Sequence, residues 1–229
     1  MKINYNYLHQ EFAQPNEIIK EWKKLIKSTD FTLGKYVAQF ESSFSKFIGS
    51  KYCISTNNGT DALILCLKAL NIKPGDEVIT VANTFYATVG AIEAVGAIPV
   101  FCDCDERYQI DINDIKKKIT KKTKVIMPVH WGGASPDMYE IMKIAKSHNL
   151  KVVEDACMGI GASLKGKSPG TFGDISAFSL HPLKSLNAMG DGGAVVTNNK
   201  KMYDWLLKYR NHGMINRDTV EIWGENKRM

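Results

Sequence analysis

The sequence predicts an α/β fold: a three-layer sandwich in which helices cover both faces of a mixed, mostly parallel sheet of about seven strands. Short runs rich in Val and Ile alternate with amphipathic helical patterns through the first two thirds of the chain, which is typical of right-handed βαβ units. Two later connections carry no helical pattern, and such connections favour an antiparallel neighbour. The length of 229 residues is sufficient for one sizeable hydrophobic core.

Seven segments are predicted as strands because they are short, β-branched and bounded by Gly, Pro, Asn or Asp. They are residues 51–56, 77–81, 98–103, 124–130, 151–155, 175–180 and 193–198. Helices are predicted near residues 60–70, 85–95, 111–119 and 136–148. No helix is expected between 155 and 175 or between 180 and 193, so one late strand should run in reverse.

Two helices are predicted before the sheet and one after it, each from apolar side chains on a single face. The face in residues 15–27 comprises Ile18, Ile19, Trp22, Leu25 and Ile26. The face in residues 35–47 comprises Val37, Phe40, Phe44 and Phe47. The last helix is indicated by Met202, Leu206 and Leu207.

Composition argues against several classes of protein. The chain has no run of eighteen apolar residues and no apolar signal-peptide region near its start, so we expect no membrane span and a cytoplasmic location. Lysines cluster in residues 115–124, but no aromatic side chains interleave there. Because Ile115 and Ile119 have the spacing of a helix's inner face, we expect a solvated helix end and no nucleic-acid site. The net charge of +6 would still help to attract an anionic small molecule.

The five cysteines are odd in number and lie mainly in apolar runs, which indicates no disulfide framework. Cys102 and Cys104 alternate along a predicted strand and could be half of a metal site. No second Cys or His pair has a matching spacing. We therefore expect ordinary core or strand-end cysteines and no metal site.

The segment "TNNGTDALILCL" follows the first predicted strand and opens a helix. Gly59 and Thr60 would present free amides, and a hydroxyl, to an anion at the strand ends. The alternative is a plain helix cap in which Thr60 or Asn58 serves only stability. Taken alone, the motif favours the cap.

Further polar residues follow two later strands, where ligands of open α/β sheets bind. Asp155 follows an apolar run and should be buried, so it needs a cation or several donors, or it is a loop or helix cap. Ser179, His181 and Lys184 follow the sixth strand. An anion cradle, a second hydroxyl, a buried carboxylate and a lysine together suit pyridoxal phosphate, which needs a phosphate site, a partner for its ring nitrogen and a Schiff-base lysine.

The chain resembles the DegT/StrS family of pyridoxal-phosphate sugar aminotransferases, which have fold type I. The resemblance covers nearly the whole chain, and its specificity comes from several motifs in the expected order. The main motifs are "STNNGTDAL", "GDEVITVANTFYATVGAIEAVGAIPVFCDCD", "VIMPVHWGGASPDM", "VVEDACMGIGAS", "GTFGDISAFSLHPLKSLNAMGDGGAVVTN", "YRNHG" and "GENKRM".

The resemblance implies a role for each candidate residue. Lys184 would be the Schiff-base lysine and the acid–base that moves the proton, and Asp155 would pair with the pyridinium nitrogen. The phosphate would be held by Gly59, Thr60 and Ser179. Phe85 would stack on the pyridine ring, its alternative being a core Phe at a helix start. Asn226 would reach the phosphate of the neighbouring subunit, which implies a homodimer with shared active sites; its alternative is an ordinary tail residue. His181 belongs to the motif without an assigned role.

The chain departs from the family in two ways. Met158 stands where the family has a Gln or His that contacts the ring hydroxyl of the cofactor, and Met cannot donate that hydrogen bond. The chain also ends at Met229, whereas the family continues into a smaller C-terminal domain. We therefore expect residues 1–229 to be the cofactor-binding large domain with its N-terminal helices, truncated before that second domain.

The function implied is a ping-pong transfer of an amino group, by resemblance from glutamate, to a keto-sugar that is nucleotide-linked. The product would enter polysaccharide, lipopolysaccharide or antibiotic sugar biosynthesis. One alternative is a sugar dehydratase of the same family, in which histidine replaces the lysine; the presence of Lys184 argues against it. Another is a non-catalytic binding or regulatory relative, which Met158 and the missing domain would favour. The segment 130–133, "HWGG", either borders the substrate pocket or packs through Trp131.

Overall fold

The computed structural model of the protein describes residues 3–214. Its seven strands are β1 (Tyr52–Thr56), β2 (Glu77–Val81), β3 (Ile98–Cys102), β4 (Thr123–Met127), β5 (Lys151–Asp155), β6 (Ile175–Ser179) and β7 (Gly193–Thr197). They form one sheet in the order β1-β7-β6-β5-β4-β2-β3. Only β7 runs against its neighbours, β1 and β6. The expected reversed strand is thereby confirmed, and it follows a connection without a helix.

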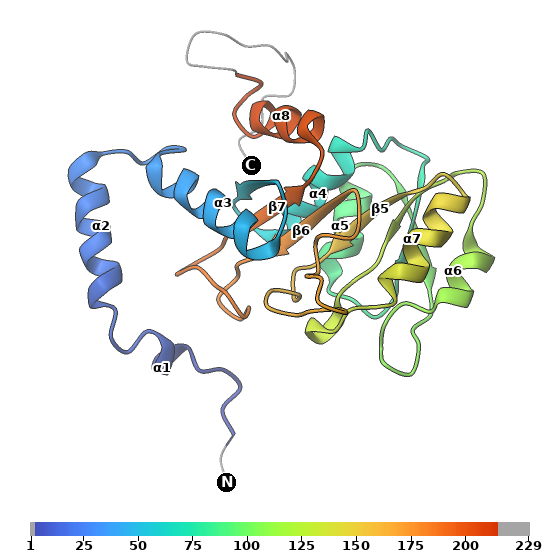
Figure 1. The fold of residues 1–229 in the computed structure, drawn as a ribbon, viewed down its shortest axis with the longest axis horizontal. Helices are drawn as coiled ribbons and strands as arrows, with labels where there is room; N and C mark the ends of the chain where they lie inside the picture. The colour runs from blue at the N-terminus through green and yellow to red at the C-terminus, as the bar shows by residue number, and fades with distance from the viewer. Residues whose placement is uncertain (1–2, 215–229) are drawn as a thin grey trace.

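The helices are α1 (Leu8–Glu11), α2 (Asn16–Ser28), α3 (Lys35–Ile48), α4 (Gly59–Ala69), α5 (Tyr86–Ala94), α6 (Ile112–Lys118), α7 (Met138–Ser147) and α8 (Lys200–Tyr209). Helices α3 to α8 form the two outer layers, whereas α1 and α2 do not pack on the sheet (Figure 1). Helices α4, α5 and α8 pack on one face of the sheet. Helices α3, α6 and α7 pack on the other. The predicted three-layer sandwich is confirmed.

The alternation of side chains along each strand explains why both faces are covered. On β7, Val195 faces the core under α4, while Ala194 and Val196 face the core under α3. On β5, Val153 and Val152 divide in the same way. A strand with both faces apolar is stable only between two helical layers, because an exposed apolar face loses the free energy of burial.

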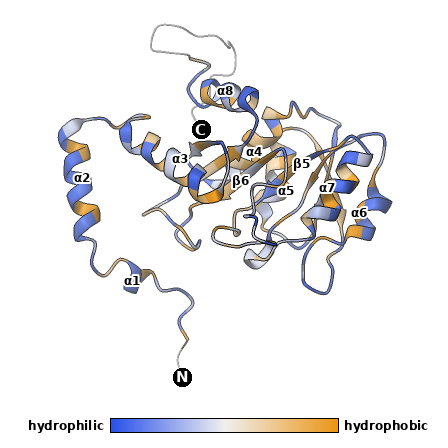
Figure 2. Cartoon of the chain, viewed as in Figure 1, coloured by the Kyte–Doolittle hydropathy of each residue, from blue (hydrophilic) through white to orange (hydrophobic). Residues whose placement is uncertain are grey.

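The N-terminal helices contact the sheet unequally. Helix α2 has the predicted apolar face, yet none of its residues is buried and Trp22 is 50% exposed. Figure 1 shows α1 and α2 extending away from the sheet, and the colouring in Figure 2 shows hydrophobic residues (orange) among hydrophilic ones (blue) along α2. In α3 the sheet is contacted by Phe44 and Ile48, whereas Phe47 is 64% exposed. The prediction that Phe47 belongs to the face of α3 that contacts the sheet is wrong. Ile48, four residues after Phe44, continues that face.

Two predictions from composition can be compared with the structure. Within residues 3–214 no helix combines the length and apolar character that crossing a membrane requires. All five cysteines are unpaired. Cys102 is buried in the core, and burial raises the pKa of its thiol to about 12.

Candidate active site

Polar residues gather at one edge of the sheet, where β5 and β6 end and β7 begins. Asp155 is the last residue of β5, and Ser179 is the last residue of β6. Gly193, the first residue of β7, pairs with Ser179 on one side and with Thr56 at the end of β1 on the other. Helix α4 also begins at this edge, because it follows β1 after only two residues.

The first turn of α4 shows which residue caps the helix and which backbone amides remain free for an anion. Asn58 is the cap: its Oδ1 accepts from the Asp61 amide at 2.8 Å, and its Nδ2 donates to the Asp61 carboxylate at 3.1 Å. No hydrogen bond within residues 3–214 uses the backbone amides of Gly59 and Thr60. The cap therefore leaves the two amides that an anion at this helix end would contact.

Gly59 lies directly against the end of β6. A Cβ at this position would be 2.7 Å from Ser179 Cβ and 3.1 Å from Cys157 Sγ. No real side chain tolerates the first distance, so the close approach of α4 to β6 requires glycine. The approach brings the Gly59–Thr60 turn and the Ser179 hydroxyl to the same place, although they are 120 residues apart in the sequence.

Asp155 is 4% exposed and lies on the face covered by α4 and α5. Its Oδ2 accepts from Thr88 Oγ1 at 2.6 Å, and its Oδ1 accepts from the Cys157 amide at 3.2 Å. No Lys, Arg or His among the described residues forms an ion pair with it. A carboxylate can accept about four hydrogen bonds, so Asp155 has acceptor capacity for a cationic donor in the site.

Lys184 is half-buried in the turn that follows β6. Its amide donates to the His181 carbonyl at 2.8 Å, and His181 Nδ1 accepts from the Leu183 amide at 3.2 Å. The imidazole of His181 thus caps the "HPLK" turn that presents Lys184, which is a role the sequence did not reveal.

The Cys157 thiol lies within electrostatic range of both Asp155 and Lys184. Burial and the Asp155 carboxylate raise the pKa of the Cys157 thiol well above its usual range, and the Lys184 ammonium acts in the opposite direction. The thiol therefore remains protonated at neutral pH and is not a nucleophile.

Phe85 and Met158 occupy different surroundings. Phe85 immediately precedes α5 and is 54% exposed, with its ring centroid 4.0 Å from that of Tyr86. The alternative of a core Phe is therefore wrong. Met158 is half-buried, and its carbonyl is next to Gly133, where a Cβ would be 3.2 Å away. Trp131 packs against the core, as the second interpretation of "HWGG" had it.

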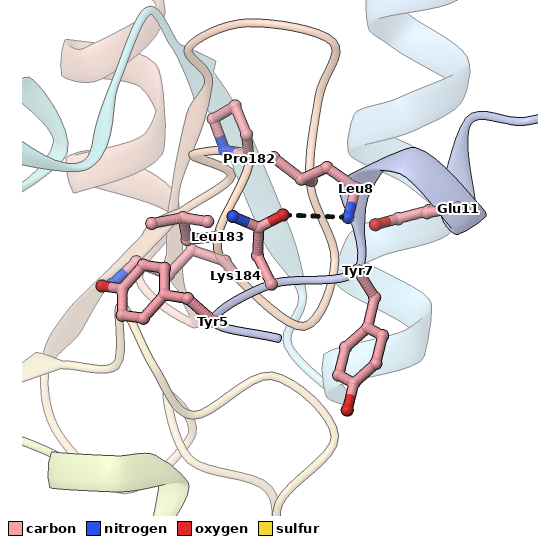
Figure 3. A pocket seen from close by; sticks show the side chains of 8 residues that line it. Tyr5, Tyr7, Leu8, Glu11, Pro182, Leu183 and Lys184 are labelled. Carbon is pink, nitrogen blue, oxygen red and sulfur yellow. Dashed lines mark hydrogen bonds between the residues drawn. The ribbon is translucent and has the colours of Figure 1, made fainter. Parts of the chain in front are cut away.

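A cavity of about 380 Å³ lies beside Lys184 (Figure 3). One wall is residues 182–184, and the other is residues 5–8 together with Glu11. The two walls are joined by Asn187 Nδ2, which donates to Glu11 Oε1 at 2.9 Å. Sequence reasoning missed this N-terminal wall, since nothing local marks residues 5–11 as neighbours of residue 184.

Glu154 was also missed, although it adjoins Asp155. It is fully buried on the opposite face of the sheet, where Oε2 contacts His130 Nε2 at 2.9 Å. Backbone amides complete its shell: those of Phe172 and Gly173 donate to Oε1 at 2.7 Å, and that of Gly170 donates to Oε2 at 2.8 Å. Burial acts to raise the pKa of Glu154, but the His130 ring and the backbone amides outweigh it and lower that pKa.

Asn226 lies outside the described residues. Within residues 3–214 no group of three or more His, Cys, Asp or Glu side chains is arranged to hold a metal ion.

Known proteins resemble this chain over nearly its whole length. The model of the DegT/DnrJ/EryC1/StrS aminotransferase family matches residues 13–229. A UDP-N-acetyl-3-dehydro-alpha-D-glucosamine 3-aminotransferase of Acidithiobacillus ferrooxidans is 42% identical over 215 residues, which are 93% of this chain and 58% of that protein. The chain thus spans little more than half of that relative.

Two solved structures share the fold. The structure of DesV from S. venezuelae in complex with a ketimine intermediate matches 100% of this chain and 62% of its own, with a TM-score of 0.90 and 33% identity. A GDP-4-keto-6-deoxymannose-3-dehydratase with a trapped PLP-glutamate geminal diamine matches 90% of this chain and 57% of its own, with a TM-score of 0.82 and 32% identity.

Proposed function

Since this chain belongs to the DegT/DnrJ/EryC1/StrS aminotransferase family, we propose that it is the cofactor-binding part of a pyridoxal-phosphate-dependent aminotransferase. Its substrates would be glutamate as amino donor and a nucleotide-linked keto-sugar as acceptor. The observation that carries the proposal is the buried Asp155 carboxylate, which has no cationic partner among residues 3–214. Asp155 and Lys184 both act electrostatically on the Cys157 thiol.

The residues at the sheet edge fit this cofactor. The amides of Gly59 and Thr60 and the hydroxyl of Ser179 would hold its phosphate, because a helix N-terminus favours an anion. Asp155 would hold the protonated ring nitrogen, and the exposed ring of Phe85 would stack on the pyridine. When bound, pyridoxal phosphate supplies an aldehyde carbon for exchange of the amine and a ring that withdraws electrons from the carbon carrying it.

Lys184 would carry out the proton transfers. Its amine would be the group that joins the cofactor and that, once released by substrate, takes the proton from the amine-bearing carbon and returns it to the cofactor. The His181-capped turn would keep this side chain aimed at the sheet edge. Met158 would contribute packing at the ring, since its thioether cannot donate a hydrogen bond.

The choice of substrates rests on the relatives. The glutamate adduct in the dehydratase structure supports glutamate as donor, and the named activity of the A. ferrooxidans relative supports a nucleotide-linked keto-sugar as acceptor. Lysine at position 184 favours transamination over dehydration. The aminated product would serve polysaccharide, lipopolysaccharide or antibiotic sugar biosynthesis.

The assembly and location are proposed as well. The enzyme would be a homodimer in which Asn226 reaches the neighbour's phosphate, and the exposed apolar face of α2 supports a partner surface. Residues 1–229 would be the large domain, with the family's smaller domain outside this sequence. Five unpaired cysteines support a reducing compartment, the cytoplasm.

Absorbance spectroscopy tests the proposal. The full-length protein mixed with pyridoxal phosphate should gain the visible band of a lysine-bound cofactor, and Lys184→Ala should abolish it. Lys201→Ala, which removes an exposed lysine elsewhere, should leave the band unchanged. A folded wild-type protein without the band would show that the catalytic interpretation is wrong. Incubation with glutamate and a panel of keto-sugar nucleotides, followed by mass spectrometry, would then identify the acceptor.

A further inference from the structure

Two threonines of the α5 turn form a hydroxyl chain that ends on Asp155. Thr88 is 1% exposed, and its Oγ1 lies 2.6 Å from Asp155 Oδ2. The Oγ1 of Thr84 lies 2.7 Å from that of Thr88. Nothing in the sequence distinguishes these two residues from ordinary capping threonines.

Each threonine hydroxyl has one proton to donate, and this fixes which group donates in each of the two hydrogen bonds. An ionised carboxylate only accepts hydrogen bonds, so the single hydroxyl proton of Thr88 is donated to Asp155. Thr88 must then accept from Thr84, whose hydroxyl is the donor of the second bond. The chain therefore runs from the partly buried Thr84 through the buried Thr88 to one oxygen of Asp155.

The same turn also carries Phe85. The amide of Thr88 donates to the Phe85 carbonyl at 3.0 Å, which closes the first turn of α5 around these residues. The helix start thus holds both the exposed aromatic ring and the hydroxyl that contacts the carboxylate. A shift of this turn would displace the plane of a stacked ring and the partner of its nitrogen together.

Building on the proposed function, we propose that Thr88 is a positioning residue for Asp155, and that Thr84 orients Thr88. With Oδ2 held by Thr88 and Oδ1 held by the Cys157 amide, the carboxylate is fixed about its side-chain torsions. The carboxylate would then present one orientation to the ring nitrogen of the cofactor, so no side-chain entropy would be lost in ordering it when the cofactor binds.

The test compares Thr88→Val, which keeps the shape and removes the hydroxyl, with Thr88→Ser, which keeps the hydroxyl. Two readouts are measured: the dissociation constant of pyridoxal phosphate, and the ¹⁵N chemical shift of its labelled ring nitrogen in the bound state. Thr88→Val should weaken binding about tenfold or more, the scale of a hydrogen bond to a charged group. It should also move the ¹⁵N signal toward that of the unprotonated ring, and Thr88→Ser should restore both values.

Thr84→Val supplies a second variant at a less buried position, and it should shift both readouts in the same direction by a smaller amount. Unchanged affinity and ¹⁵N shift in Thr88→Val would overturn the positioning role while leaving the proposed function intact. A wild-type protein that binds no pyridoxal phosphate would overturn the proposed function itself. Failure of Thr88→Ser, which keeps the hydroxyl, to restore the ¹⁵N signal would show that the hydroxyl alone does not position Asp155, and would overturn the proposal in this form.

Discussion

Glu154 and Asp155 are consecutive buried carboxylates at the end of β5, and they lie on opposite faces of the sheet. Glu154 accepts from three backbone amides and the Ser176 hydroxyl and contacts the His130 ring. Asp155 accepts from one hydroxyl and one amide. The hydrogen-bond acceptor capacity of Glu154 is filled by groups of the protein itself, whereas that of Asp155 is only half used. Burial alone therefore does not identify a functional carboxylate; the number of its internal donors does.

The two environments also differ in what they hold together. The three backbone amides that donate to Glu154 come from the loop between β5 and β6, so this carboxylate holds a helix-free connection against the sheet. The donors to Asp155 come from the first turn of α5 and from the Cys157 amide. We expect substitution of Glu154 to lower the free energy of unfolding, and substitution of Asp155 to lower the rate of the cofactor-dependent reaction.

The largest expected effect is that of Asp155→Asn, which keeps the shape and removes the charge. Under the proposed function, kcat/KM for the half-reaction with glutamate should fall about a hundred- to a thousandfold, the scale of removing one preorganised electrostatic group. The thermal midpoint should change little, because the amide oxygen can still accept from the Cys157 amide and the amide NH₂ can donate to the Thr88 hydroxyl, which then donates to Thr84. Stopped-flow absorbance and calorimetry measure the two quantities. A variant that keeps its rate would remove the distinction between the two carboxylates.

Glu154→Gln should be the more destabilising substitution. An amide offers one acceptor oxygen and an NH₂ donor that would face backbone amides, so several buried donors lose their partner. The free energy of unfolding should fall by about 3 kcal/mol at neutral pH, as measured by urea denaturation. Glu93→Gln on the exposed side of α5 is the control and should stay within about 0.5 kcal/mol. Equal effects of the two variants would contradict the structural role of Glu154.

The smallest effect is the pH dependence of that stability difference. The pKa of Glu154 is lowered from its ordinary value of 4.5, so its stabilisation is fully present above that value and is lost as the pH falls through the folded-state pKa. The difference in unfolding free energy between wild type and Glu154→Gln should thus narrow below about pH 4.5. Denaturation series at several pH values measure it. A difference that stays constant down to the acid transition would mean that the Glu154 charge contributes nothing.

Much of the fold could be predicted because its signals are local. All seven strands were expected within a few residues of their bounds, and one late strand was expected to be reversed. Of the two strands that follow helix-free connections, β7 is antiparallel and β6 is parallel to its neighbour β5, so the missing helix did not by itself identify the reversed strand. The face of α2 was also predicted from local spacing, but whether that face is buried depends on neighbours far away in the sequence. Periodicity indicates which side of a helix is apolar, and only tertiary packing decides what covers it.

The sequence by itself determined the candidate residues Gly59, Asp155, Ser179 and Lys184, because glycine, carboxylate, hydroxyl and amine carry their chemistry wherever the chain puts them. Tertiary structure alone decided how they combine. Thr88 and Asp155 are 67 residues apart, and their contact exists only because α5 packs on the face of the sheet where β5 presents Asp155. Because side chains alternate along β5, Glu154 lies on the opposite face, where backbone amides of residues 170–173 donate to it. A hydrogen bond joins positions in space, so its partners follow from the packing of layers and not from the order of residues.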